Sequence, residues 1–177
     1  MIPTLEASRL LVRPFSWDDF PWFLAAHQDP VIGRYLLYRT PWTEEFARWF
    51  FSDLLAHYEQ DGMGHMALVR KGDGAIVGRS GLSSWLVEGE VELGYTLPQE
   101  HWGKGYATEG SQALRDYGFG VMGLPRLISL IEQGNEPSMA VARRNGFVYE
   151  RDVEREGGRT FTIWAGTREA WHAGRQP

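Results

Sequence analysis

Three strand-like runs follow one another in the middle of the chain, at residues 65–70, 75–82 and 88–97. Turn-forming residues lie between the first two, at Lys71-Gly72-Asp73-Gly74, and again in the Glu88-Gly89-Glu90 region. Consecutive strands that are joined by short turns pair in antiparallel order. The centre of the chain is therefore predicted to form an antiparallel β-meander, which restricts the fold to one built on a sheet.

Helices are predicted before the meander, and alternating helices and strands after it. Residues 8–14 are expected to form a first strand that stops at Pro14, because proline cannot donate to a strand ladder. Helices are then expected to begin at Asp18-Asp19 and at Thr43-Glu44-Glu45. The later elements are a helix over 106–119, a strand over 126–132, a helix over 137–145, and strands 147–154 and 160–166 joined across Glu156-Gly157-Gly158. This order predicts an α+β (mixed α/β) fold, with a mostly antiparallel sheet flanked by helices.

The composition indicates one compact unit with little affinity for nucleic acid. The chain has 177 residues, 43% of them apolar, and no repeat, low-complexity tract or linker, so residues 1–177 are expected to form a single domain. Eighteen basic residues against 23 acidic ones give a net charge of −5. Binding to a phosphate backbone needs clustered lysines and arginines, so a nucleic-acid partner is not expected. A cationic substrate is favoured instead.

What the sequence lacks excludes several kinds of site. There is no cysteine, so no disulfide, thiolate metal site or cysteine nucleophile can form. The five histidines do not have the spacing of a zinc helix, and no metal is expected. The first residues do not resemble a signal peptide, and no uncharged apolar run reaches 18 residues. We therefore expect a cytoplasmic protein with no membrane partner.

A glycine-bearing loop, Pro98 to Thr108, connects the third strand of the meander to the following helix. Gly103 and Gly105 allow left-handed backbone conformations and leave the amides open to a ligand. Successive amides at the positive end of a helix suit a pyrophosphate, and Lys104 would add a cation at the rim. The letters fit neither G-x-G-x-x-G, because Thr108 takes the last position, nor a P-loop, because Gly105 follows Lys104. A tight turn without a ligand explains this stretch alone equally well.

A second constellation runs from Asn135 to Phe147, Asn-Glu-Pro-Ser-Met-Ala-Val-Ala-Arg-Arg-Asn-Gly-Phe. With it, the chain resembles the GNAT superfamily of N-acetyltransferases, in the RimJ/RimL branch that acetylates ribosomal-protein N-termini. The other matching segments are Ser8 to Pro14, Asp29 to Val31, Arg34 to Leu36, and Glu92 to Tyr95 leading into Trp102 to Glu109. The resemblance spans roughly residues 5 to 166, and several motifs in one order are more specific than any single motif.

The resemblance implies a GNAT fold, in which two splayed parallel strands bind acetyl-CoA. The loop amides would hold the pyrophosphate, at Trp102, Gly103, Lys104, Gly105, Tyr106, Ala107 and Thr108. The strand before the loop would pair with the pantetheine arm, at Tyr95, Thr96 and Leu97. Asn135 and Ser138 would lie near the cofactor arm and the thioester. Two positions depart from the family pattern: Glu100 stands where a glutamine or arginine is usual, and Ala142 where many relatives have a tyrosine.

The chemistry requires a base, because a lysine-like amine is protonated at neutral pH and only the neutral amine can attack. Glu92 is the candidate, directly or through water, if burial raises its pKa. An ion pair between Glu92 and a neighbouring arginine is the competing interpretation. A backbone N–H near Tyr95 or Thr96 would hold the oxyanion. Ser138, with Asn135, is the candidate group at the departing thiolate, and a plain helix-surface role for Ser138 is the alternative.

The acceptor amine is the least determined part of the hypothesis. Most aromatic residues of the early helices should belong to the core, but Tyr38, Trp42 and Trp85 are candidates for the acceptor pocket. The sequence does not distinguish a protein N-terminus from a small amine such as a polyamine or an amino acid. A domain that binds acyl-CoA without turnover, as a sensor or interaction module, is the alternative function. A homodimer is compatible with the family.

Overall fold

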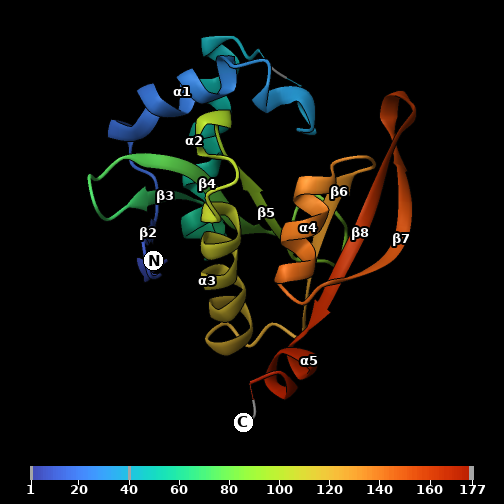
Figure 1. Ribbon diagram of the computed structural model, residues 1–177. Helices are drawn as coiled ribbons and strands as arrows, with labels where there is room; N and C mark the ends of the chain where they lie inside the picture. The colour runs from blue at the N-terminus through green and yellow to red at the C-terminus, as the bar shows by residue number, and fades with distance from the viewer. Residues whose placement is uncertain (1, 40, 176–177) are drawn as a thin grey trace.

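The computed structural model describes residues 2–39 and 41–175, which are built around one eight-stranded sheet (Figure 1). The strand order is β1-β2-β3-β4-β5-β6-β8-β7. Every neighbouring pair is antiparallel except β5 and β6, which run parallel. The strands are β1 (Leu5–Glu6), β2 (Leu10–Arg13), β3 (Gly64–Arg70), β4 (Ile76–Ser83), β5 (Glu92–Thr96), β6 (Arg126–Glu132), β7 (Val148–Arg155) and β8 (Arg159–Thr167). The predicted α+β fold with a mostly antiparallel sheet is confirmed.

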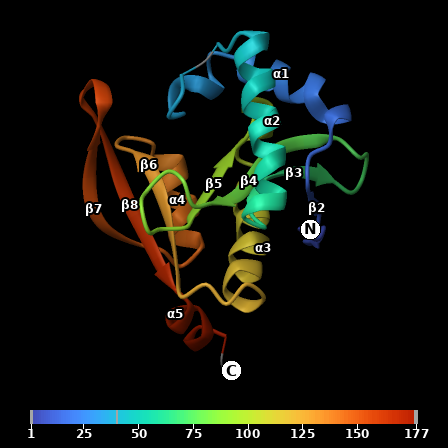
Figure 2. The ribbon, with the colours of Figure 1, turned by 180° about the vertical axis from the view of Figure 1, so that it is seen from behind.

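Helices cover both faces of the sheet. The α-helices are α1 (Phe20–Gln28), α2 (Glu44–Gln60), α3 (Tyr106–Gly120), α4 (Glu136–Arg144) and α5 (Arg168–Ala173), and the short 3-10 helices are η1 (Trp17–Asp19), η2 (Ile32–Arg34), η3 (Gln99–His101) and η4 (Glu156–Gly158). The helices α3 and α4 lie in front of the sheet in Figure 1, whereas α2 lies in front when the molecule is seen from behind (Figure 2). Leu68 on β3 faces α3, and the next residue, Val69, packs in the aromatic cluster of α1 and α2. This alternation is expected because successive side chains of a strand point to opposite faces.

The sequence located most elements to within a few residues, with three corrections. The third strand of the meander is shorter than predicted: it begins at Glu92, not residue 88, because Gly89 adopts a left-handed conformation (φ 75°) in a turn. Strand β1, of two residues, was missed because so short a run has no readable periodicity. Helix α5 was also missed, although Thr167 caps it through a hydrogen bond from the Ala170 amide.

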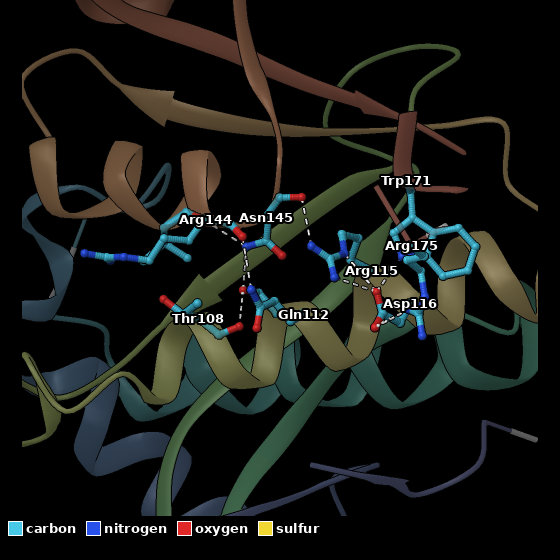
Figure 3. A network of polar contacts seen from close by, with 10 residues as sticks. Thr108, Gln112, Arg115, Asp116, Arg144, Asn145, Trp171 and Arg175 are labelled. Carbon is cyan, nitrogen blue, oxygen red and sulfur yellow. Dashed lines mark hydrogen bonds and ion pairs between the residues drawn. The ribbon is translucent and has the colours of Figure 1, made fainter. Parts of the chain in front are cut away.

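A polar network joins α3 to the end of α4 (Figure 3). The buried Asn145 side chain donates to the Ser111 hydroxyl at 2.8 Å, and Arg115 donates to the Asn145 carbonyl at 3.0 Å. Gln112 donates to the Arg144 carbonyl at 3.0 Å. Because buried hydrogen-bonded groups are costly to separate, these contacts fix the two helices relative to each other. The N-terminal ends of both helices meet the same cleft, which is described below.

The helices of the described residues include none with the length and apolar character required to cross a membrane. Across residues 2–39 and 41–175, no group of three or more histidine, cysteine, aspartate or glutamate side chains is placed to hold a metal ion.

Candidate active site

Strands β5 and β6 separate shortly after they meet. Their one register pair in the described residues is Glu92 with Ile128, supported by the Ile128 amide on the Val91 carbonyl at 2.9 Å and the Ser129 hydroxyl on the Leu93 carbonyl at 2.8 Å. Beyond this point β5 stays paired with β4, and β6 stays paired with β8. Backbone groups alternate sides along a strand, so the Tyr95 amide points to the same side as the Leu93 carbonyl, toward the gap.

The glycine loop opens onto this gap. Gly103 and Gly105 both adopt left-handed conformations, with φ of 70° and 80°, as the sequence predicted. Gly105 is the N-cap residue of α3 and has no side chain to accept from the first helical amides. A Cβ atom at Gly103 would meet no atom of the described residues within 4 Å. The loop therefore presents bare backbone and the positive end of a helix to the cleft.

Arg9, immediately before β2, holds the loop through side-chain and backbone contacts. Its guanidinium donates to the Glu109 carboxylate at 2.8 Å and to the Lys104 carbonyl at 3.0 Å, and it lies 4.8 Å from the centre of the Tyr106 ring. Its backbone amide also donates to Glu109. Sequence reasoning missed this contact, because Arg9 and Glu109 lie 100 residues apart and only the tertiary structure brings them together.

One cleft of about 1250 Å³ contains the gap, the loop and the acceptor side of the sheet. The candidate residues that line it are Glu92, Tyr95, Thr96, Leu97, Trp102, Gly103, Gly105, Tyr106, Ala107, Thr108, Asn135, Ser138, Tyr38, Trp42 and Trp85. Lys104 and Glu100 are not among the lining residues. The Lys104 carbonyl accepts from Arg9. Arg144 does line the cleft, and in Figure 3 its side chain extends away from Asn145 on the Thr108 side of the network.

Glu92 lies at the point where β5 and β6 part. It is only 7% exposed, and the Ser83 hydroxyl donates to its carboxylate at 3.3 Å. Burial raises the pKa of Glu92 from 4.5 to about 7, against the opposing effects of the Leu130 amide, the Ser83 hydroxyl and the charges of Arg79 and Arg155. Within the described residues, no arginine, lysine or histidine nitrogen lies within 4.0 Å of this carboxylate to form an ion pair.

Two further ionisable side chains line the cleft beside Glu92, and sequence reasoning missed both. His65 on β3 and Arg79 on β4 are buried to 9% and 5% exposure. From the sequence, an arginine within a strand is predicted to lie at the surface, since arginines are rarely buried unless paired. Their position across the sheet from Glu92 depends on strand pairing, which the sequence does not specify.

Across the gap, Tyr95 contacts the N-terminal turn of α4. Its hydroxyl donates to the Ser138 carbonyl at 2.7 Å, and burial raises the pKa of this phenol. The Asn135 side chain accepts from the Ser138 amide at 3.3 Å, so Asn135 caps α4. Ser138 is half-buried and lines the cleft. Ala142 is fully buried in the core, away from the lining.

The three aromatic candidates for the acceptor pocket stand above the other face of the sheet. Trp42 is buried, stacks on His27 at 4.2 Å between ring centres and donates to the Tyr38 carbonyl at 3.1 Å. Trp85, which follows β4, is 43% exposed. The segment before Tyr38 is held by Arg159, which donates to the Leu36 and Leu37 carbonyls at 3.0 and 3.1 Å.

Comparisons with known proteins agree with this geometry. The acetyltransferase (GNAT) domain family matches residues 9–148. The uncharacterized N-acetyltransferase p20 of Bacillus licheniformis is 29% identical over 166 residues, which cover 91% of this chain and 93% of that protein. The solved structure of an acetyltransferase from Agrobacterium tumefaciens str. C58 has a TM-score of 0.80 at 30% identity, covering 94% of this chain and 95% of that one.

A more distant structure shares the fold. RimL, the ribosomal L7/L12 α-N-protein acetyltransferase solved in complex with coenzyme A, has a TM-score of 0.81 at 18% identity, covering 95% of this chain and 99% of that one. The matches agree with the splayed strands and the glycine loop at the N-terminus of α3. The chain therefore belongs to the GNAT family of acetyltransferases and is an acyltransferase.

Proposed function

We propose that residues 1–177 act as one N-acetyltransferase domain that transfers an acetyl group from acetyl-CoA to a primary amine by direct attack. Acetyl-CoA supplies the activated acetyl group as a thioester. The observation that carries the proposal is the buried Glu92 carboxylate, whose pKa is about 7 and which lies in the cleft at the head of the gap between β5 and β6. A base poised near neutral pH suits the deprotonation of an amine.

The residues at the gap fit a long, anionic cofactor arm. The glycine loop and the N-terminus of α3 would hold the pyrophosphate through backbone amides. Arg144 lines the cleft and would add a side-chain cation, together with Lys104 at the rim. The Tyr95 backbone would pair with the pantetheine arm, as an added strand pairs with a free sheet edge.

Glu92 would take a proton from the ammonium group of the acceptor, directly or through water. The neutral nitrogen then forms the new C–N bond, the C–S bond of the thioester breaks, and the second proton of the nitrogen passes to the departing sulfur. The Tyr95 amide, directed into the gap, would stabilise the oxyanion. The Ser138 hydroxyl, next to the helix cap made by Asn135, would donate to the sulfur. The products are an N-acetyl amide, a thiol and the proton held by Glu92.

Two measurements test the proposal. Acetyl-CoA and coenzyme A should each raise the melting temperature, and NAD and ATP should not, because only ligands that bind the folded state stabilise it. At 100 times the dissociation constant, the gain of about 2.7 kcal/mol corresponds to roughly 5–11 °C for a chain of this size. Turnover is then measured with a panel of amines. Glu92→Gln should lower turnover and leave the acetyl-CoA shift intact, and unchanged turnover would exclude Glu92 as the base.

The second candidate function is a domain that binds acyl-CoA without turnover. Ala142 favours it, because this buried methyl group cannot donate a proton to sulfur as a tyrosine at this position would. Thiol release from acetyl-CoA that depends on an added amine separates the two functions. A melting shift with no such release, for every amine, would support the binding domain.

A further inference from the structure

The acceptor face of the sheet carries a row of chemically contrasting groups between α2 and the gap. Three cross-strand pairs of β4 and β5 form it, and we call them the acceptor floor: Ser83 with Glu92, Gly81 with Gly94, and Arg79 with Thr96. Alternate residues of a strand share a face, so Glu92 and Arg79 stand on the same side of the sheet, two rows apart. The glycines leave the middle row without side chains of its own.

His65 occupies the middle row from the neighbouring strand. It pairs with Gly81 across β3 and β4, and a Cβ atom on Gly94 would lie 3.0 Å from the His65 ring and 3.4 Å from the Glu92 carboxylate. Glu92, His65 and Arg79 all line the cleft. The floor therefore presents an acid at one end, an imidazole in the middle and a guanidinium at the other end.

Arg79 is the unusual member of this row. It is 5% exposed, and its Nε atom is buried with no hydrogen-bond partner in the described part of the chain. Over residues 2–39 and 41–175, no carboxylate oxygen lies within 4.0 Å of a guanidinium nitrogen of Arg79. A buried guanidinium without a partner is strongly unfavourable, because its desolvation is not offset. The fold keeps this cation at the wall of a substrate cleft, where a ligand can supply the missing partner.

The groups around Arg79 do not neutralise it. Burial lowers the pKa of Arg79 to about 10, so it still carries its charge at neutral pH. Burial also lowers the pKa values of His27 and His65, which are therefore neutral, and raises the pKa of Tyr58. Glu92 is the carboxylate whose charge acts on Arg79. When Glu92 takes up a proton, Arg79 loses even this distant counter-charge.

We infer that the acceptor is a small zwitterion, such as a free amino acid, that places its ammonium group at Glu92 and its carboxylate on Arg79. This inference rests on the proposed function and adds the substrate class to it. A guanidinium matches a carboxylate through two parallel hydrogen bonds, and the His65 Nδ1 atom, which has no partner among the described residues, offers one more polar contact. The carboxylate is bound and not consumed, so the atoms and protons of acetyl transfer balance as before.

The first test compares each common amino acid with its own carboxamide, at neutral pH and with saturating acetyl-CoA. A polyamine and a short peptide with a free N-terminus complete the panel. At least one free acid should be used with a kcat/KM about tenfold or more above that of its amide, because a site built for a polar group rejects the analogue that lacks it. If the amides, the polyamine or the peptide are used as well as every free acid, the inference is wrong.

The second test uses Arg79→Met, which keeps the length of the side chain and removes its charge. The ratio of kcat/KM between acid and amide should fall to about one, with an unchanged KM for acetyl-CoA, since loss of the charged partner removes the discrimination. Arg79→Lys should restore part of the preference. Arg70→Met, which removes an arginine of β3 outside the cleft lining, is the matched control and should keep the preference. An unchanged preference in Arg79→Met would overturn the inference.

Binding separates this inference from the proposed function. If acetyl-CoA raises the melting temperature but no amine is acetylated, the proposed function fails. The protein loaded with coenzyme A is then titrated with the same pairs of acids and amides by calorimetry. Binding of an acid in preference to its amide, lost in Arg79→Met, would support the anion site without catalysis. Equal binding of acids and amides would overturn it. If Arg79→Met does not fold, the inference is tested by two other comparisons of each acid with its amide, one in the wild type and one in Arg79→Lys. Equal use of acid and amide by the wild type would overturn the inference.

Discussion

The Tyr95 hydroxyl donates to the Ser138 carbonyl at 2.7 Å, so β5 and the first turn of α4 are joined across the gap where β5 and β6 part. Strand pairing does not connect the two sides here, whereas this bond and the polar network between α3 and α4 do. This bond spans the gap at the place where the cofactor arm is proposed to lie.

Removal of this link should widen the gap. Tyr95→Phe deletes the donor and should cost about 1 kcal/mol of unfolding free energy, the usual value for one hydrogen bond. It should also raise the KM for acetyl-CoA several-fold, which steady-state kinetics measures alongside chemical unfolding. Ser138→Ala is the control, because the acceptor is the backbone carbonyl and survives the change. A Ser138→Ala variant with normal stability and lower kcat would support the hydroxyl as the donor to sulfur, and a normal kcat would exclude that role.

Glu92 should make the protein less stable as the pH rises. Its pKa is raised from 4.5 to about 7 in the folded state, so the folded form binds the proton more tightly. The free energy of unfolding is therefore unaffected by Glu92 below pH 4.5 and falls as the pH rises to about 7. Above pH 7 the loss is constant and on the order of 3 kcal/mol.

Glu92→Gln removes this loss of stability, because the amide does not ionise. The variant should be more stable than the wild type above pH 7, and the two should converge toward pH 4.5, as measured by chemical unfolding across this range. The kcat/KM of the wild type should rise with pH through the same pKa, since only the carboxylate accepts a proton. An equal difference in stability at all pH values would show that the folded-state pKa is not raised.

Arg9 should act on the cofactor through the shape of the loop. Arg9→Ala removes the contacts to Glu109 and to the Lys104 carbonyl, and should raise the KM for acetyl-CoA roughly two- to fivefold, the scale of an exposed ion pair. The kcat should change little, because Arg9 is placed at the loop and not at Glu92. A double-mutant cycle with Glu109→Gln provides the control: if the two effects add fully, the pair does not act as a unit.

Arg144 should supply a cation for the pyrophosphate of acetyl-CoA. Arg144→Ala should raise the KM for acetyl-CoA roughly fivefold, since unit charges 4 Å apart in water interact by about 1 kcal/mol. The effect should shrink as salt is added, because salt screens exposed charges. Arg143→Ala is the matched control, because Arg143 does not line the cleft and lies over the Trp164 ring. Equal effects of the two variants would remove the specific role of Arg144.

The sequence by itself determined the elements and the part of the site that follows directly from them. The loop conformation at Gly103 and Gly105 can be predicted because only glycine adopts left-handed φ without strain. A strand before these residues and a helix after them define the loop. Glu92 could be selected because it lies on the strand that leads into this loop. These features depend on residues that are close in sequence, where local conformational preference and hydrophobic periodicity decide the structure.

Only the tertiary structure decided which distant side chains meet. Arg79 and Glu92 share the acceptor floor because β4 pairs with β5 in one register, and a shift of one residue would have turned every side chain of the strand to the other face. Arg9, which is distant in sequence, reaches the Glu109 carboxylate and the Lys104 carbonyl. Register and long-range contact arise from the packing of the whole sheet against its helices, so the sequence cannot show that the Arg79 Nε atom is buried without a partner among the described residues.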